Sequence, residues 1–540
     1  MKTCICLLVL FVCASPFSLA DDEGHHHEDM TEVQVGTVQF PSSCAASVQK
    51  PIERGVAMLH SFWYEEAEKQ FQQIEKDDPQ CAIAHWGLAM SIWHQLWNRP
   101  DKPTLERGRA ELKQARSVKN GTARERGYIS ALSTFYAHPG RAYQKRVTAY
   151  SKAMEKVSGQ NPDDHEAAAF YALSLLASEP DHDNNANRKK AAAVLEKLFT
   201  ENPDHPGVAH YLIHTYDKPD MAQQGLPAAR KYASLAPAAP HALHMPAHIF
   251  ARLGLWQDDI DSNEASIAAT QKEAAMHMGG EGHQFHAMDF LVYAYLQTGR
   301  EQDAQKIIDE VHAMPPMKDM YGMGFDPRFF ALSAFPAAYA LELHRWSDAA
   351  QLAPVDGAPS HMKSVTYAAR AIGAARSGNV EQVRKEVEQL QAIQRELEPK
   401  KKKDEGEYNG VTEELTIAKA WLAHAEGQHD EAVKLLRSIA DKEEGEAEAS
   451  QGIPAHEMIA DMLMEANRPG EALAEYQEAL KTDPGRFDSL YGAAHAAELA
   501  GKHDKANEYY SALLKNCEGS KSERSELQHA REQVQLSAKF

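Results

Sequence analysis

The stretch EALAEYQEALKTDP, Glu471–Pro484, decides the fold of this 540-residue chain. Its small, aromatic and small residues at Ala472, Tyr476 and Ala479 are followed 34 positions later by Ala506, Tyr510 and Leu513, so the first two positions repeat and the third becomes a larger apolar residue. A small residue lets two antiparallel helices approach closely, the ring one turn later fills the gap between them, and a proline such as Pro484 ends the helix. The spacing therefore predicts a helix–turn–helix repeat of 34 residues.

The same spacing of a small residue, a large residue and a proline recurs along the chain. Copies stand at Glu53–Pro79, with Gly55, Ala67 and Phe71, at Ala191/Leu195/Pro203, Ala228/Tyr232/Pro240 and Ala304/Ile308/Pro316, and in degenerate form at Tyr150/Met154/Pro162. Stacked hairpins bury a continuous core and line a concave groove with the first helix of each pair. We therefore predict an all-α fold, an α-solenoid with arrays over 40–313 and 328–540 and a Met-, Gly- and Pro-rich joint at 314–327.

These repeats resemble those of tetratricopeptide-repeat proteins over nearly the whole chain. The opening segments FPSSC (40–44), HSFWYEEAEKQF (60–71) and DPQCAIAHWGLAMS (78–91) are similar to those of exported bacterial members. The resemblance implies a binding scaffold that holds a protein, a peptide or a small ligand in its groove, through residues of the first helices.

The N-terminus has the pattern of a secretory signal. Lys2 precedes an apolar run, Pro16 breaks that run, and small residues lead to a cleavage site after Ala20. We expect residues 1–20 to be a signal peptide and 21–39 a disordered tail rich in acids and histidines. The apolar run is shorter than the roughly 20 residues that span a bilayer. The chain is thus predicted to be exported to the periplasm or the extracellular space, without a membrane span.

Three cysteines follow the predicted signal. Cys44 and Cys81 are natural disulfide partners in an exported protein, and the alternative is a pair of buried thiols. Cys517 is then left without a partner in the sequence, and its role is open.

Composition and motifs exclude several classes of function. Lys and Arg number 57 against 78 Asp and Glu, so the net charge of −21 argues against sequence-independent nucleic-acid binding. The sequence contains no HExxH, GxSxG, GxGxxG, GxxxxGK[ST] or CxxC motif. Standard hydrolase, kinase and dehydrogenase templates therefore have no support.

Histidines are concentrated in one band of the chain. Nine of the 27 lie between 205 and 286: His205, His210, His214, His241, His244, His248, His277, His283 and His286. Aligning the repeats on Ala228, Pro240 and Ala304 gives five of them equivalent first-helix positions, namely His210, His214, His244, His248 and His286. Residues i and i+4 share a helix face, so the pairs 210/214 and 244/248 are potential two-point ligands.

This register predicts a transition-metal site. Adjacent first helices pack about 8–10 Å apart, so their imidazoles can reach one ion. The five histidines are the primary candidate ligands, and His241, His283, Asp217 and Asp289 are secondary ones. Zinc and copper both suit imidazole, and the neighbouring Met245 and Met288 keep copper among the candidates.

Other interpretations of the histidines stay open. Pro246 stands between His244 and His248, where a kink would spoil the i,i+4 geometry. The histidines can also be packing residues, or a clamp for a carboxylate ligand that titrates near neutral pH. A metal-dependent hydrolase built on residues 210–289 is the alternative function, with Glu264, Glu281 or Asp289 as its general base.

Overall fold

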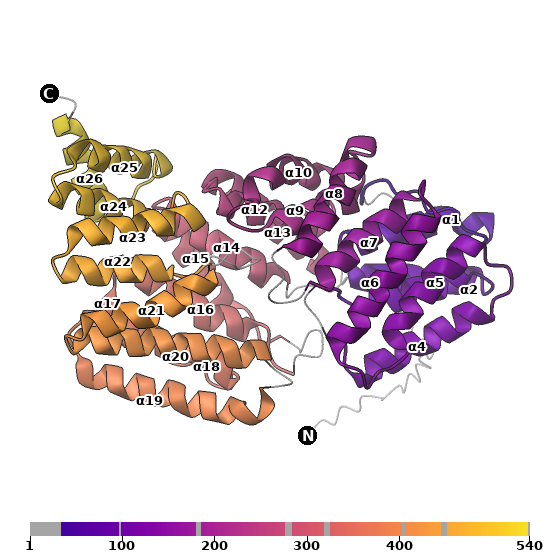
Figure 1. Ribbon diagram of the computed structural model, residues 1–540, viewed down its shortest axis with the longest axis horizontal. Helices are drawn as coiled ribbons and strands as arrows, with labels where there is room; N and C mark the ends of the chain where they lie inside the picture. Colours follow the sequence, from indigo (N-terminus) through magenta and orange to yellow (C-terminus); the bar gives the residue numbers. More distant parts are fainter. Residues whose placement is uncertain are drawn as a thin grey trace, which may run out of the picture. The chain divides into compact units, whose positions relative to one another are not determined.

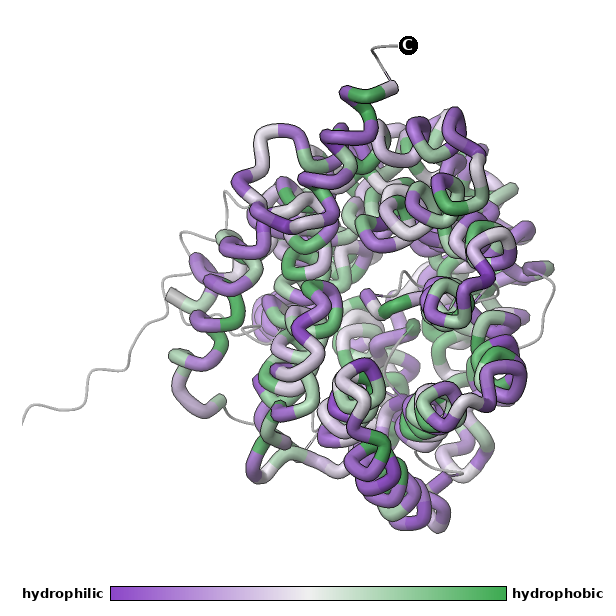
Figure 2. The backbone as a smooth tube through the Cα atoms, turned by 90° about the vertical axis from the view of Figure 1, so that its left-hand side faces the viewer, coloured by the Kyte–Doolittle hydropathy of each residue, from purple (hydrophilic) through white to green (hydrophobic). Residues whose placement is uncertain are grey.

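The computed structural model describes residues 34–96, 99–179, 185–275, 283–317, 324–401, 405–443 and 451–537. Within these ranges the chain forms helices joined by short loops, without a strand, and Val35–Phe540 makes one compact unit. Figure 1 shows the helices in chain order. In Figure 2 polar and apolar residues alternate along them, as amphipathic helices with one buried face require.

The first half of the array runs from η2 to α14. Its bounds are η2 (Ala46–Val48), α1 (Gln49–His60), α2 (Tyr64–Asp77), α3 (Ala82–Ser91), α4 (Lys102–Ser117), α5 (Ala123–Tyr136), α6 (Tyr143–Gln160), α7 (His165–Ala177), α8 (Ala186–Glu201), α9 (Pro206–Tyr216), α10 (Ala222–Leu235), α11 (Pro240–His244), α12 (Pro246–Arg252), α13 (Trp256–Ala275) and α14 (His283–Gln297).

The second half runs from α15 to α26. Its bounds are α15 (Glu301–Ala313), α16 (Arg328–Glu342), α17 (Trp346–Ala349), α18 (Ser360–Arg376), α19 (Val380–Leu397), η3 (Glu398–Lys400), α20 (Glu405–Ala425), α21 (His429–Glu443), α22 (Ala455–Glu465), α23 (Pro469–Thr482), α24 (Phe487–Leu499), α25 (His503–Asn516) and α26 (Ser525–Ser537).

The predicted hairpin packing is confirmed at both ends of the array. The Phe71 ring of α2 is fully buried against Gly55 of α1 and Gly87 of α3. A Cβ atom at Gly87 would lie 2.3 Å from that ring, so only glycine lets these helices approach so closely. Tyr476 of α23 contacts Gly492 of α24 in the same way. The α-solenoid expected from the small–aromatic spacing is therefore correct.

Two contacts join helices that are far apart in sequence. Helix α1 packs on α9, and α14 packs on α24. The second contact brings Tyr293 and Arg486 within hydrogen-bonding distance, 3.0 Å between the hydroxyl and Nη1. The predicted joint lies between α15 and α16, but 318–323 are outside the described residues, so the boundary at 314–327 stays a prediction.

The described N-terminal segment, from Gln34 to Ala45, has no helix, and its Phe40 ring stacks on Trp86 of α3 at 5.4 Å between centroids. The predicted signal peptide and most of the predicted tail, residues 1–33, lie outside the described residues. No helix in the described ranges is long and apolar enough to cross a membrane.

Cys44 and Cys81 are joined by a disulfide, with their Cα atoms 4.7 Å apart. It links the segment before α1 to the start of α3 and closes a loop of 37 residues. Cys517 is a buried thiol, and burial raises its pKa to about 12.

We expect the Cys44→Ser/Cys81→Ser variant to lose about 3–4 kcal/mol of unfolding free energy, because the opened loop gives entropy back to the unfolded chain. Urea unfolding with and without reductant measures this loss. Reductant should bring the unaltered chain to the variant's stability and leave the variant unchanged. Equal stability of the oxidised chain and the variant would contradict the prediction.

Candidate metal centre

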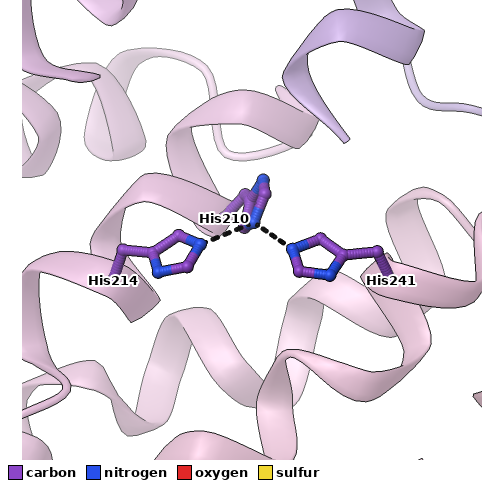
Figure 3. A group of neighbouring side chains, drawn as sticks. All are labelled: His210, His214 and His241. Carbon is purple, nitrogen blue, oxygen red and sulfur yellow. Dashed lines mark hydrogen bonds between the residues drawn. The ribbon is translucent and has the colours of Figure 1, made fainter. Parts of the chain in front are cut away.

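Three histidines from α9 and α11 point their Nε2 atoms at one another (Figure 3). His210 and His214 are one helical turn apart on α9, and His241 lies near the start of α11. The Nε2 atom of His210 is 3.1 Å from that of His214 and 3.1 Å from that of His241. We call these residues the first triad.

Three further histidines from α11, α12 and α14 form a second triad. It consists of His244, His248 and His286, whose ligand atoms lie within 4.8 Å of one another. The Nε2 atoms of His244 and His248 are 3.1 Å apart, and the rings of His244 and His286 have centroids 4.5 Å apart. His244 and His248 are buried, and His286 is exposed.

Pro246 leaves the second triad intact. Helix α11 ends at His244 and α12 begins at Pro246, so the proline stands at a first-turn position where its missing N–H is not needed. Met245 between them has φ −52° and ψ −35°, and its carbonyl accepts from the His248 amide. The backbone therefore stays helical, and the two rings share one side, as i,i+4 residues do.

The Nδ1 atoms of three of these histidines face hydrogen-bond acceptors. His210 Nδ1 lies 2.6 Å from the His60 carbonyl oxygen, and His248 Nδ1 lies 2.7 Å from Asp217 Oδ2. His244 Nδ1 lies 2.6 Å from Asn263 Oδ1. The Asn263 amide is fixed in this orientation because its Nδ2 donates to the carbonyl of Asp259 at 3.0 Å.

These contacts determine where the protons of the rings lie. A carbonyl, a carboxylate and an amide oxygen only accept, so each Nδ1 is the donor and carries the hydrogen. A neutral imidazole has one N–H, so Nε2 of His210, His244 and His248 then presents a lone pair. In the second triad two such lone pairs, on His244 and His248, face each other at 3.1 Å.

In the first triad the surroundings favour neutral rings at two of the three positions. Burial lowers the pKa of His210 to about 3 and that of His214 well below its usual value. Two neutral acceptor nitrogens at this distance repel each other unless a cation lies between them. Ligand nitrogens 2.0–2.1 Å from a tetrahedral ion are about 3.3 Å apart, close to the spacing in both triads.

Phe62 covers the first triad. It follows α1 with φ 55°, a left-handed conformation that is costly for an aromatic residue, by about 1–3 kcal/mol. Its ring packs edge-on against His210 at 4.3 Å and stacks against His214 and His241 at 5.6 Å each. The strained backbone thus places an apolar wall directly on the three imidazoles.

A third buried group, formed by His60, Glu166 and His205, adjoins the first triad at the His60 carbonyl. Glu166 of α7 accepts from His60 Nε2 at 2.6 Å and from His205 Nε2 at 3.0 Å. Burial alone would raise the pKa of Glu166, but the two imidazoles lower it. The carboxylate and both imidazoles satisfy one another, so we interpret this group as a packing element that holds α1, α7 and α9 together.

All five primary candidates from the sequence lie in the two triads. The secondary candidate His241 completes the first triad, and Asp217 orients His248 from behind and also pairs with Arg252 at 3.1 Å. Asp289 is half-buried in α14 and belongs to neither triad, and burial raises its pKa to about 7. The side chain of His283 lies outside the described residues. Met288 is part of the hydrophobic core.

Sequence reasoning missed Phe62, Asn263 and the role of the His60 carbonyl. Asn263 lies 19 residues from His244, and His60 lies 150 residues from His210. Phe62 reaches the first triad only where α1 packs on α9. The pairing of His244 with Asn263 follows no repeat spacing. The clearest sequence signal available was the aromatic cluster beside His60.

A family model described as tetratricopeptide repeat matches residues 64–102 and 457–521, so the chain carries such repeats near both ends of its array. The chain is also similar to solved structures. One is human IFIT1, solved as a dimer with m7Gppp-AAAA, at 15% identity and a TM-score of 0.33, with 80% of this chain and 89% of that chain covered. Another is the TPR domain of P58(IPK), at 14% identity and a TM-score of 0.20, with 92% of this chain and 100% of that chain covered. No curated protein matches the chain.

Proposed function

We propose that this chain of tetratricopeptide repeats binds two transition-metal ions, one in each histidine triad. The observation that carries the proposal is the pair of Nε2 atoms of His244 and His248, 3.1 Å apart, while both Nδ1 atoms face acceptors. An ion between the nitrogens turns a repulsive contact into two coordinate bonds. The same spacing occurs twice in the first triad.

The ligand set suits zinc or copper. Imidazole nitrogen is a good ligand for both, and three histidines leave a fourth position for water or another ligand. His214 and His241 are half-buried and His286 is exposed, so that position faces solvent on one side. The hydrogen bonds behind His210, His244 and His248 fix ring orientation, as is usual for metal-bound histidine.

The wider proposal from the sequence is an exported scaffold that holds a protein, a peptide or a small ligand in its groove. The two tetratricopeptide segments support the scaffold part of this proposal. The hydrolase alternative has weaker support. Glu264 accepts from the Tyr295 hydroxyl at 2.6 Å, Asp289 lies outside both triads, and Glu281 is outside the described residues.

Metal analysis of the chain without an affinity tag tests the proposal. After loading and dialysis we expect two ions per chain, one ion after His210→Ala or His248→Ala, and none after both. His138→Ala, at an exposed position far from the triads in sequence, is the matched control and should keep two. Less than one ion per chain, or a double variant that retains its metal, would refute the proposal.

Asp217→Asn should weaken metal binding at the second triad about 10- to 100-fold, because an amide orients and polarises His248 less well than a carboxylate does. Competition with a chelator of known affinity measures the change. Asp258→Asn, which alters an exposed ion pair with Arg230, serves as the control and should leave the affinity unchanged. An unchanged affinity in Asp217→Asn would show that the carboxylate does not act on the metal site.

A further inference from the structure

Building on the metal sites proposed above, we infer that the two triads form a single dinuclear copper centre that binds dioxygen between its two ions. The inference requires the sites to be neighbours, the ligand set to prefer monovalent copper, and the surroundings to accept an apolar diatomic molecule. Each of these requirements is met by a separate set of contacts.

The two triads share a boundary made of their own imidazoles. Helix α11 supplies one ligand to each triad, His241 to the first and His244 to the second, with ring centroids 6.3 Å apart. His214 of the first triad and His248 of the second lie at 6.5 Å. Ring-to-ring contact between the ligands of two ions is the arrangement expected of a dinuclear site.

The charges of the site favour monovalent ions. All six ligands of the two triads are histidines, and imidazole binds a metal ion in its neutral form. No carboxylate or thiolate of the described residues belongs to either triad. The nearby carboxylate of Asp217 is already paired with His248 and Arg252. Two divalent ions repel each other four times as strongly as two monovalent ions at the same separation, because the energy follows the product of the charges.

Copper is the transition metal that meets these conditions. Its monovalent form takes neutral, fairly soft ligands and is stable with three of them, whereas zinc has only the divalent state. Two divalent zinc ions in these triads would need an anionic bridge to offset four positive charges. Two copper(I) ions carry half that charge.

Dioxygen can supply the missing anion by accepting electrons from the ions. Each copper(I) gives up one electron and becomes copper(II), and O₂ accepts both electrons to become peroxide, with the O–O double bond reduced to a single bond. The total charge of ions and ligand is +2 before and after this step. Binding therefore needs no proton and no outside reductant, and release of O₂ returns both electrons.

Aromatic walls flank the centre on two sides. Phe62 covers the first triad, and the buried Phe290 ring lies 5.0 Å from His244 and 4.7 Å from His248 between centroids. Apolar walls accept an apolar gas and keep bulk water from the reduced ions. His286, which is exposed, marks the open side through which a small molecule enters.

The test uses the full chain, loaded with two equivalents of copper(I) without oxygen and then exposed to O₂. We expect one O₂ taken up per two coppers, an intense near-ultraviolet charge-transfer band that disappears on removal of O₂, and an electron paramagnetic resonance signal far below that of two isolated copper(II) ions. Two bound coppers with the full resonance signal would overturn this inference and leave the metal sites standing. Failure to retain copper or zinc would overturn both proposals.

Single variants distinguish a dinuclear centre from two ions that act independently. His214→Ala should keep copper in the second triad and lose all O₂ uptake, because one ion alone cannot reduce O₂ to peroxide. His138→Ala should behave like the unaltered chain. Half of the O₂ uptake in His214→Ala would mean that the ions act separately, and would contradict the inference.

Discussion

Zinc, used as a redox-inert probe, should stabilise the folded chain by about 4 kcal/mol per occupied triad when its free concentration is 1,000 times the dissociation constant. The reason is mass action. The triads bring together residues of α9, α11, α12 and α14, and the unfolded chain has no such arrangement. Thermal unfolding with and without zinc measures the effect as an upward shift of the melting temperature.

The His210→Ala/His248→Ala variant is the decisive comparison for this effect. Each substitution removes one ligand from one triad, so the variant should unfold at the same temperature with and without zinc. His138→Ala should keep the full shift. A zinc-induced shift of equal size in the double variant would place the stabilising ions elsewhere, and the account of the triads would be wrong.

Arg486→Leu should lower the free energy of unfolding by about 3–5 kcal/mol, the largest effect we expect from a single substitution outside the triads. Arg486 precedes α24 and is fully buried. Its guanidinium donates to Glu457 of α22 at 2.7 Å and to Glu342 of α16 at 2.6 Å. Without it, two carboxylates remain buried and close together, with no cation between them.

Urea unfolding measures this loss. The matched control is Arg468→Leu, which breaks a pair with Glu471 at the surface and should cost far less than Arg486→Leu, because water screens an exposed ion pair. Burial already raises the pKa of Glu457 to about 7, although Arg486 lowers it. Adding Glu457→Gln to Arg486→Leu should therefore recover part of the loss. Equal stabilities of Arg486→Leu and Arg468→Leu would contradict this explanation.

The sequence contained enough to predict the helical hairpins and most of the histidines that form the two triads. Small and aromatic residues at fixed spacing, such as Ala472 and Tyr476, pack within one hairpin. Their pattern can therefore be recognised in a single segment of the sequence. The pairs 210/214 and 244/248 are also local, since one helical turn separates their members. A prediction from spacing succeeds where both partners lie on the same helix or the same repeat.

The grouping of the ligands could not be predicted because it depends on how successive repeats stack. Repeat register placed His244 with His248 but gave no reason for His241, one turn earlier on the same helix, to join the first triad. Phe62 takes its place through the contact of α1 with α9, which spans about 150 residues. No local pattern encodes such a contact.

Anomalous X-ray scattering from a metal-loaded crystal, measured on both sides of the metal's absorption edge, tests the central claim most directly. We predict two peaks per chain, one among the Nε2 atoms of His210, His214 and His241 and one among the ligand nitrogens of His244, His248 and His286. Empty triads in a crystal whose metal lies elsewhere, for example on the histidines at 25–27, would contradict it.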